Sequence, residues 1–406
     1  MRVKIVGSGR VGAPLGAWFL QKGIKVSFSD INEELLKNVY EGWLDWEEPG
    51  LNAALRDGRS NMLDPDETNC DWTFITVGTP VDKGGQPILH HLEDVVKEHY
   101  QNSNIVLRST VAPGTCDKLA ERFNTTIWHA PERLLLGNGM DELDELPQIV
   151  GCTENGAAGS YVLGCQDFHR AFGTIFPSFR FGTALEAECA KVSNNIVRYI
   201  EFATGTELAE QFAKLGANPQ TVREMMIDGY KRGRLAFPSF VGSYCLNKDW
   251  YMLASATGET PTLASAAAKY NTNLPNKLLE NLNFHGKTVL ICGLTYKPNL
   301  DDCRETPSVA LYWETFLKKA DKILYHDPIV NVQETYETLW PNIPTEFEVV
   351  RDIADVMHTV DVLIIATAHD DYSALNYNDL KDGSIIVDPA YVVNRKFGQE
   401  GFVVEV

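Results

Sequence analysis

The chain has 406 residues, a net charge of −19 and an ordinary globular composition, with 44% apolar and 22% charged residues. A chain of this length is too long for a single hydrophobic core, so two or three domains are expected. The acidic charge and the lack of a long basic run argue against nucleic acid or an anionic membrane as a partner.

The eight cysteines form no CxxC pair, so the sequence predicts no structural zinc site or other metal centre. The N-terminal stretch MRVKIVGSG has an apolar run too short for a signal peptide. No run of about 18 apolar residues is present to span a bilayer. We therefore expect a cytoplasmic protein with free thiols.

The first 30 residues predict a strand, a tight turn, a helix and a second strand, with GSGRVG as the turn. Gly7 permits the turn, Gly9 lets a pyrophosphate approach the backbone, and Gly12 lets the helix pack closely on the strand. The helix N-terminus then faces the phosphates. The residues of this turn expected to contact a dinucleotide are Gly7, Gly9, Arg10, Val11 and Gly12.

Asp30 stands at the end of the second predicted strand, 18 residues after Gly12. An acid at this place accepts hydrogen bonds from the adenosine ribose. Its carboxylate repels a 2′-phosphate, and the following stretch DINEELL contains no arginine. The sequence therefore predicts NAD rather than NADP as the cofactor.

Three further β-rich runs, DWTFITVGTP, NIVLRSTVAPGT and TTIWHAPERLLLG, continue the predicted sheet. Thr79, Thr110 and Glu132 follow the strands of these runs. Ligands of open α/β sheets lie beyond the carboxyl ends of the strands, so these three residues are candidates for ligand contacts. Turn chemistry explains each of them equally well, because threonine and proline are common in loops.

Residues 184–216 contain no proline and repeat apolar residues at helical spacing, which predicts one long helix ending near Gly216. A helix this long often bridges domains or forms a dimer seam. Lys191 and Asn195 are four residues apart and share one face of it. On spacing alone, a solvated polar stripe is the commoner explanation of such a pair.

The stretch VGSYCLNKD places a cysteine beside polar residues. If a helix begins here, Cys245, Lys248 and Asp249 share one of its faces. A buried structural cysteine usually has apolar neighbours at that spacing, whereas this thiol has a cation and a carboxylate.

The last third predicts a second α/β domain. KTVLICGLTYKPNLDDCRETPS reads as strand, loop and helix without GxGxxG, and three more apolar strands follow, as buried parallel strands do. The expected fold class is α/β, with two doubly wound, Rossmann-like domains joined by a helical domain with a long central helix. The expected domains cover residues 1–183, 184–270 and 271–406.

Taken in order, GSGRVG, VGTP, RSTVAPG, PERLLLG, GSYCLNKD and GLTYKPNLDDCRETP resemble the motifs of the nucleotide-sugar 6-dehydrogenase family, best known from its UDP-glucose dehydrogenases. The similarity spans essentially the whole chain. It implies oxidation of the C6 alcohol of a nucleotide sugar, UDP-glucose first, to a carboxylate by two NAD. It also implies that the first domain binds NAD, the second forms a homodimer and the third binds the nucleotide sugar.

The resemblance also implies residue roles. Cys245 would capture the intermediate aldehyde as a thiohemiacetal, whose oxidation gives a thioester that water hydrolyses. Lys191 and Asn195 would stabilise the oxyanion. Asp249 would transfer protons, through a water that Thr110 also holds. The further implied cofactor contacts are Thr79, Thr110, Lys248 and Arg304, and the implied substrate contacts are Glu132, Lys191, Asn195, Tyr296, Lys297 and, across a dimer interface, Arg234.

The sequence departs from the family pattern at several places. Leu136 stands where many UDP-glucose enzymes carry a second glutamate, and Asn247 replaces the commoner proline. A UDP-N-acetylhexosamine or GDP-mannose therefore stays open as the substrate. Two other functions also stay open: a one-hydride dehydrogenase of hydroxy acids, and a nucleotide-sugar binder without catalytic activity.

Overall fold

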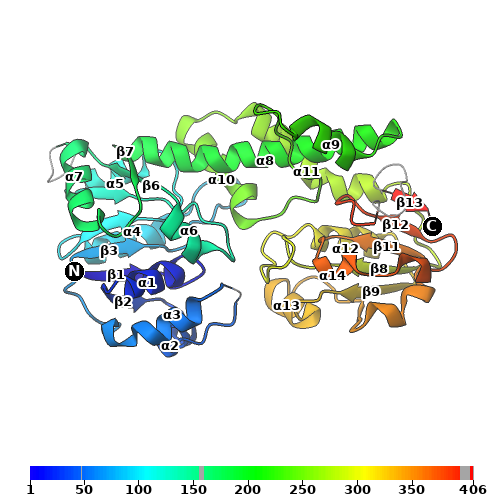
Figure 1. The fold of residues 1–406 in the computed structure, drawn as a ribbon, viewed down its shortest axis with the longest axis horizontal. Coiled ribbons are helices and arrows are strands. Elements are labelled where there is room, and N and C mark those ends of the chain that lie inside the picture. Colours follow the sequence, from blue (N-terminus) through cyan, green and yellow to red (C-terminus); the bar gives the residue numbers. More distant parts are fainter. Residues whose placement is uncertain (47, 155–159, 394–402, 406) are drawn as a thin grey trace. The chain divides into compact units, whose positions relative to one another are not determined.

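The computed structural model describes residues 1–46, 48–154, 160–393 and 403–405. The chain divides into two compact units, one formed by residues 1–195 and 248–261 and the other by residues 196–247 and 262–406. Each unit contains one β-sheet with helices packed on its faces (Figure 1). Within the described ranges, no helix is both long and apolar enough to cross a bilayer.

The first unit contains a seven-stranded sheet in the order β2-β1-β3-β4-β5-β6-β7. Neighbouring strands are parallel except β5 and β6. The strand order reverses beside β1, and such a switch point is where doubly wound sheets bind ligands. The strands are β1 (Arg2–Val6), β2 (Lys25–Ser29), β3 (Trp72–Ile75), β4 (Asn104–Leu107), β5 (Ile127–His129), β6 (Gln148–Cys152) and β7 (Phe179–Thr183).

Helices of the first unit pack on this sheet around an aromatic core that includes Trp18, Phe19, Phe74 and Phe172. The central strands β3 and β5 are fully buried and consist largely of β-branched or aromatic residues, which favour extended backbone. The helices are α1 (Gly12–Gln21), α2 (Glu33–Glu41), α3 (Leu51–Asp57), the 3₁₀ helix η1 (Gly58–Asn61), α4 (His90–His99), α5 (Thr115–Phe123), α6 (Gly139–Glu145) and α7 (Tyr161–Phe172).

The second unit contains a six-stranded sheet in the order β10-β9-β8-β11-β12-β13, in which only β12 and β13 pair antiparallel. Its order reverses at β8, between β9 and β11, so it has a switch point of its own. The strands are β8 (Thr288–Cys292), β9 (Lys322–His326), β10 (Glu348–Val349), β11 (Val362–Ile365), β12 (Ile385–Val387) and β13 (Val403–Glu405).

The second unit also carries its own helices. They are α9 (Pro219–Ile227), α11 (Thr262–Leu279), α12 (Ser308–Leu317), α13 (Val332–Leu339), α14 (Asp370–Ser373) and the 3₁₀ helices η2 (Ile353–Asp355), η3 (Met357–Thr359) and η4 (Tyr377–Asp379). Two helices contribute residues to both units: α8 (Ala184–Lys214) and α10 (Tyr244–Thr257).

The two doubly wound sheets and the long helix confirm the predicted fold class. Helix α8 has 31 residues, which corresponds to about 46 Å at ~1.5 Å per residue. The chain leaves this helix at Gly216, whose φ of 73° lies in the left-handed region. The predicted domain boundaries stay a prediction.

The turn between β1 and α1 generates a stability prediction. A Cβ atom on Gly12 would overlap the carbonyl oxygen of Gly7 and lie 2.6 Å from Thr76 Oγ1, whereas one on Gly9 would meet no atom within 4 Å. We expect Gly12→Ala to lower the free energy of unfolding by about 1–3 kcal/mol through overpacking. Gly9→Ala is the matched control and should change it little. Thermal denaturation of the three proteins tests this, and equal melting temperatures for both variants would contradict it.

Candidate active site

The turn after β1 has the shape that a pyrophosphate requires. Gly7 has a φ of 92°, and its N–H donates to Ser29 O over 2.8 Å. The Asp30 carboxylate accepts the N–H of Ser8 over 2.6 Å, so the acid fixes the turn. The space beside Gly9 is open, and the first turn of α1 follows at once. The residues present therefore fit a dinucleotide. Arg10 lies over the ring of Trp46, with its Cζ 5.6 Å from the ring centroid.

The loops after β3 and β4 meet at the same edge of the sheet. Thr79 Oγ1 donates to the carbonyl oxygen of Thr110 over 2.5 Å, and Ser109 Oγ donates to Val77 O over 2.6 Å. The structure thus brings together two residues that the sequence placed only at separate strand ends. Both threonines lie next to the switch point beside β1.

Glu132 follows β5 and forms a buried ion pair with Arg108, which follows β4. Arg108 is 1% exposed and donates from both Nε and Nη2 to Glu132 Oε2. The other carboxylate oxygen accepts the N–H groups of Arg133 and Leu134 over 2.7 and 2.9 Å. Burial by itself raises the pKa of Glu132, but the Arg108 charge and these hydrogen bonds outweigh it and hold the pKa below its ordinary value. Glu132 is therefore an ionised group that orders its loop.

Sequence reasoning missed Arg108. The signal was an arginine directly after the apolar run NIVL, where a buried charge needs a partner.

The predicted face of α8 carries a hydrogen-bonded cluster. Asn195 Nδ2 donates to Asp249 Oδ2 over 2.5 Å, and Lys248 Nζ lies 2.7 Å from Asp249 Oδ1. Asp249 is fully buried. Lys191 is also buried, one turn before Asn195, and its charge contributes to the lowered pKa of Glu132. The face is therefore a buried polar cluster, and the alternative of a solvated stripe is wrong.

A second charged residue missed by sequence reasoning, an acid, lies one turn before Lys191. Glu188 is fully buried, and its carboxylate accepts the N–H groups of Gly114 and Cys116 over 2.6 and 2.8 Å. These amides belong to the start of α5. The carboxylate thereby fixes α8 to that helix N-terminus, close to the loop that carries Thr110.

In the second unit, Cys245 lies in the first turn of α10. Its N–H donates to Ser243 Oγ over 3.3 Å, and Ser243 has a φ of 143°, a strained value for a residue with a side chain. A Cβ on Gly242 would lie 2.7 Å from Glu305 O and 2.8 Å from Tyr296 Cβ. Only glycine therefore fits at this point of the cysteine loop.

Arg304 lies within electrostatic reach of the Cys245 thiol. Its guanidinium pairs with Asp302 over 2.6 Å, and its Cζ lies 5.3 Å from the ring centroid of Tyr244. The hydrogen bond to Asp302 raises the pKa of Arg304, and the charge of Cys245 contributes in the same direction. The loop after β8 places Tyr296 and Lys297, both half-buried, at the second switch point. Arg234 is exposed in the loop that follows α9.

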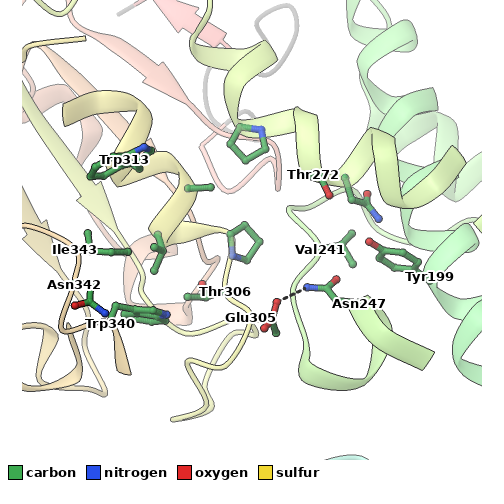
Figure 2. Close-up of a pocket in the computed structure, with 15 residues that line it drawn as sticks. Tyr199, Val241, Asn247, Thr272, Glu305, Thr306, Trp313, Trp340, Asn342 and Ile343 are labelled. Carbon is green, nitrogen blue, oxygen red and sulfur yellow. Dashed lines mark hydrogen bonds between the residues drawn. The ribbon is translucent and has the colours of Figure 1, made fainter. Parts of the chain in front are cut away.

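A cavity of about 650 Å³ lies beside the cysteine loop within the second unit (Figure 2). Asn247 Nδ2 donates to Glu305 Oε2 over 3.4 Å across its wall. Asn247, which replaces the commoner proline, thus connects the start of α10 to the segment that follows Arg304. The other lining residues include Val241, Thr306, Trp313, Trp340 and Ile343. Among the described residues, no three His, Cys, Asp or Glu side chains are grouped to hold a metal ion.

Family models match three parts of the chain, and all three describe the UDP-glucose/GDP-mannose dehydrogenase family. They are its NAD binding domain over residues 1–163, its central domain over residues 185–273 and its UDP binding domain over residues 290–395. The chain belongs to this family. The cofactor is therefore NAD, as predicted. The UDP binding domain supports a nucleotide sugar as the substrate.

Individual relatives differ in substrate. The chain is 26% identical to a UDP-N-acetyl-D-mannosamine dehydrogenase of Pyrococcus horikoshii, over 97% of this chain and 96% of the relative. It is also 26% identical to a UDP-glucose 6-dehydrogenase of Rickettsia conorii, over 96% of this chain and 94% of the relative. Among solved structures, a UDP-glucose dehydrogenase from Pyrobaculum islandicum shares the fold, with a TM-score of 0.84, 22% identity and coverage of 97% and 94%.

The Arg108–Glu132 pair generates a pH prediction. The pKa of Glu132 is lower in the folded protein than its ordinary value. The ionised Glu132 therefore stabilises the fold at pH values above the ordinary glutamate pKa. This stabilisation is lost as the pH falls through the pKa of the folded protein. We expect Arg108→Met to lower the free energy of unfolding by about 3–5 kcal/mol at neutral pH. The loss should be smaller near pH 4, since the unpaired Glu132 then takes up a proton.

Urea denaturation at both pH values measures this effect. The control is Arg122→Met, which breaks the exposed pair with Glu93 and should cost less than about 1 kcal/mol at either pH. An Arg108→Met loss that did not change with pH would mean that Arg108 acts through packing alone.

Proposed function

We propose that this protein oxidises the C6 hydroxymethyl group of a UDP-sugar to a carboxylate, with UDP-glucose to UDP-glucuronate as the first candidate. NAD, when bound, supplies the hydride acceptor for each of the two oxidations. The observation that carries the proposal is the buried cluster of Asn195, Lys248 and Asp249. Two of these residues lie on α10, three and four positions after Cys245, and therefore share its helix face.

The thiol answers a chemical need of the second oxidation. An aldehyde keeps one hydrogen on its carbonyl carbon, but it cannot release that hydrogen as hydride until a nucleophile adds to the carbon. The Cys245 sulfur forms a bond to that carbon and gives a thiohemiacetal. Loss of hydride and of the hydroxyl proton then gives a thioester. Water adds to the thioester, the C–S bond breaks, and the carboxylate and the thiol are released.

The polar residues of the cluster have distinct tasks in this proposal. Lys191 and Asn195 stabilise the alkoxide oxygen that forms at C6, one by charge and one by its amide N–H. Asp249 accepts and returns protons through a water that Thr110 also holds. Glu132, already bonded to Arg108, orders the loop beside the sugar. The NAD contacts are those of the GSGRVG turn, Asp30, Thr79, Thr110, Lys248 and Arg304.

The remaining contacts concern the nucleotide and the assembly. Tyr296 and Lys297 hold the nucleotide part of the substrate in the 271–406 domain. The protein works as a cytoplasmic homodimer through the 184–270 domain, and Arg234 reaches the site of the other subunit. The 1–183 domain holds NAD.

A UDP-N-acetylhexosamine is the second candidate substrate. Relatives at 26% identity include dehydrogenases of UDP-N-acetyl-D-mannosamine as well as of UDP-glucose. Leu136 supports this alternative, since it removes the second glutamate of many UDP-glucose enzymes. GDP-mannose is the third candidate, on the family name.

A panel of nucleotide sugars with NAD tests the proposal. UDP-glucose, UDP-N-acetylmannosamine, UDP-N-acetylglucosamine and GDP-mannose are each incubated with the protein, and the NADH formed per sugar is counted. We expect two NADH per molecule for one UDP-sugar. One NADH would favour a single-hydride dehydrogenase, and binding without NADH would favour a non-catalytic binder.

The α8 face gives a kinetic prediction. Lys191→Ala and Asn195→Ala should each lower kcat about 10²–10³-fold with little change in KM, because oxyanion donors act mainly in the transition state. The exposed neighbour Asn194 is the matched control, and Asn194→Ala should keep the wild-type kcat. Steady-state kinetics measures both. A near-normal kcat in Lys191→Ala and Asn195→Ala would remove this face from the mechanism.

The proposed role of Cys245 predicts a covalent intermediate between the protein and the substrate. Cys245→Ala should fail to complete the second oxidation, and Cys245→Ser should stall as a sugar ester or turn over very slowly, since an alkoxide is a poorer nucleophile than a thiolate at neutral pH. Intact-protein mass spectrometry after incubation with substrate and NAD detects the adduct. Cys189→Ala is the control and should turn over normally. Two NADH per sugar at the wild-type rate from Cys245→Ala would make the thiol structural.

A further inference from the structure

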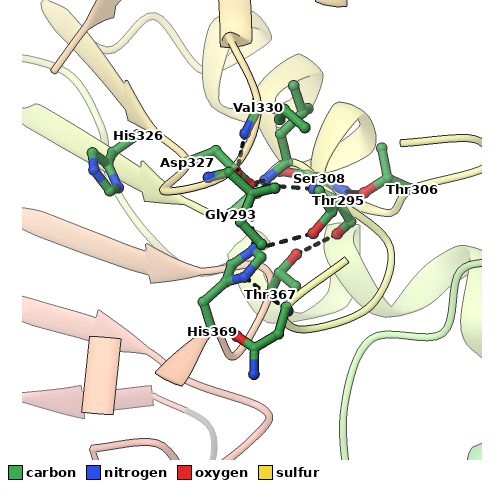
Figure 3. Close-up of polar contacts among 12 residues, drawn as sticks. Gly293, Thr295, Thr306, Ser308, His326, Asp327, Val330, Thr367 and His369 are labelled. Carbon is green, nitrogen blue, oxygen red and sulfur yellow. Dashed lines mark hydrogen bonds and ion pairs between the residues drawn. The ribbon is translucent and has the colours of Figure 1, made fainter. Parts of the chain in front are cut away.

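Three strands of the second sheet end together around the loop that carries Tyr296 and Lys297. These strands, β9, β8 and β11, are neighbours, and the switch point lies between the last two. The loop of residues 293–300 follows β8, Asp327 follows β9, and His369 lies in the connection after β11. Figure 3 shows Thr295, Asp327 and His369 grouped at these strand ends. The loop is therefore contacted from both neighbouring strands.

Asp327 holds the beginning of the loop. Its side chain is fully buried, and its Oδ2 accepts the N–H of Leu294 over 2.6 Å. Its Oδ1 accepts the N–H groups of Ile329 and Val330 over 2.8 and 3.0 Å. Burial by itself raises the pKa of Asp327, but the hydrogen bonds from His369 and Leu294 outweigh it and hold the pKa below its ordinary value. The ring of His369 thus faces an ionised carboxylate.

The hydrogen bonds of His369 determine its tautomer. The ring is fully buried, and Nδ1 accepts the N–H of Asn299 over 3.0 Å. In a neutral imidazole whose Nδ1 accepts, the proton lies on Nε2. Nε2 is 3.3 Å from Asp327 Oδ2 and 3.1 Å from Thr295 Oγ1, so it donates toward both. Thr295 Oγ1 in turn donates to Lys297 O over 3.0 Å, which leaves its lone pairs to accept from the ring.

One ring therefore contacts the loop on both sides of Tyr296 and Lys297. It reaches the side chain of Thr295 before them and the backbone N–H of Asn299 after them. An imidazole can do this because its two ring nitrogens point in different directions and act as acceptor and donor. Thr367, two residues before His369, adds a hydrogen bond from Oγ1 to Thr295 O over 2.5 Å.

We propose that His369 is a positioning residue for nucleotide recognition: its neutral ring holds the 295–299 segment in the conformation in which Tyr296 and Lys297 receive the nucleotide of the substrate. This rests on the proposed function, which gives those two residues that role. The ring of His369 is fully buried, so in this proposal it acts through the loop and not on the substrate. Its loss should therefore weaken nucleotide binding and leave the chemical steps largely unchanged.

Two substitutions of His369 separate the contributions of its two ring nitrogens. His369→Asn keeps an acceptor near the position of Nδ1, whereas His369→Gln keeps a polar group near Nε2 and loses the acceptor for Asn299. The matched control is His326→Gln, because His326 lies in the same unit, beside Asp327, and its ring contacts Tyr372 rather than the loop. Melting temperatures and circular dichroism of all four proteins establish that they are folded.

The first measurement is hydrogen–deuterium exchange of the full chain without ligand. We expect the amides of residues 294–300 to exchange faster in His369→Gln, and at nearly the wild-type rate in His369→Asn and His326→Gln. This measurement needs no assumption about function. Unchanged exchange in a folded His369→Gln protein would overturn the proposal directly.

The second measurement is calorimetric titration with UDP and with NADH. We expect His369→Gln to raise the Kd for UDP about tenfold or more, because a buried backbone donor loses its acceptor. The Kd for NADH should stay within twofold, as should kcat at saturating sugar, while KM for the sugar rises. Faster exchange of the loop with an unchanged Kd for UDP would overturn the proposed role in recognition. If the wild-type protein binds neither UDP nor a UDP-sugar, the proposed function fails, and the exchange result still decides whether the ring holds the loop.

Discussion

The sites of this protein depend on one interaction: buried or half-buried carboxylates that accept backbone N–H groups of the loops at the strand ends. A loop amide removed from water needs a partner, and an ionised oxygen forms a stronger hydrogen bond than a neutral one. Each such acid fixes a loop, and all of these loops except the one held by Glu48 carry candidate ligand contacts. The acids, each with the residues whose backbone N–H groups it accepts, are Asp30 (Ser8), Glu48 (Gly137, Gly139, Met140), Glu132 (Arg133, Leu134), Glu188 (Gly114, Cys116) and Asp327 (Leu294, Val330).

These acids differ in how their charge is compensated, and the difference separates their roles. Glu132 has Arg108, and both of its oxygens already accept hydrogen bonds, so it has little capacity to move a proton. The Asp249 carboxylate accepts one hydrogen bond on each oxygen, from the Lys248 ammonium and from the Asn195 amide. A carboxylate with two single partners keeps lone pairs for a water. This is why we assign proton transfer to Asp249 and loop ordering to Glu132, although both are acids of the same unit.

Periodicity and turn chemistry predicted the elements of the fold and the residues at strand ends. The GSGRVG turn, the helix from residue 184 and the places of Thr79 and Thr110 at strand ends follow from local patterns. The hydrogen-bond partners of the buried polar groups could not be predicted from the sequence, because each pair joins distant parts of the chain. Arg108 and Glu132 are 24 residues apart, Glu188 and Gly114 are 74 apart, and Asn299 and His369 are 70 apart.

A local sequence pattern could not reveal those distant pairs. A charged residue in an apolar run indicates that it must have a partner, but it does not indicate which residue the partner is. The antiparallel pairing of β5 with β6 is a similar case. Nothing in the apolar run of β6 distinguishes it from the parallel strands beside it. Its direction depends on how the connecting chain packs.

The contacts of Lys248 bear on the role that the proposed function gives to the Cys245 thiol. The ammonium of Lys248 lies 2.7 Å from Asp249 Oδ1 and compensates the charge of that buried carboxylate. A charge paired this closely exerts a weaker field on a third group, because the two charges form a dipole. In the second unit, by contrast, the charge of Cys245 acts on Arg304, whose own partner Asp302 keeps it protonated. Arg304 therefore lies within electrostatic reach of the thiol to which the proposed function gives the role of nucleophile.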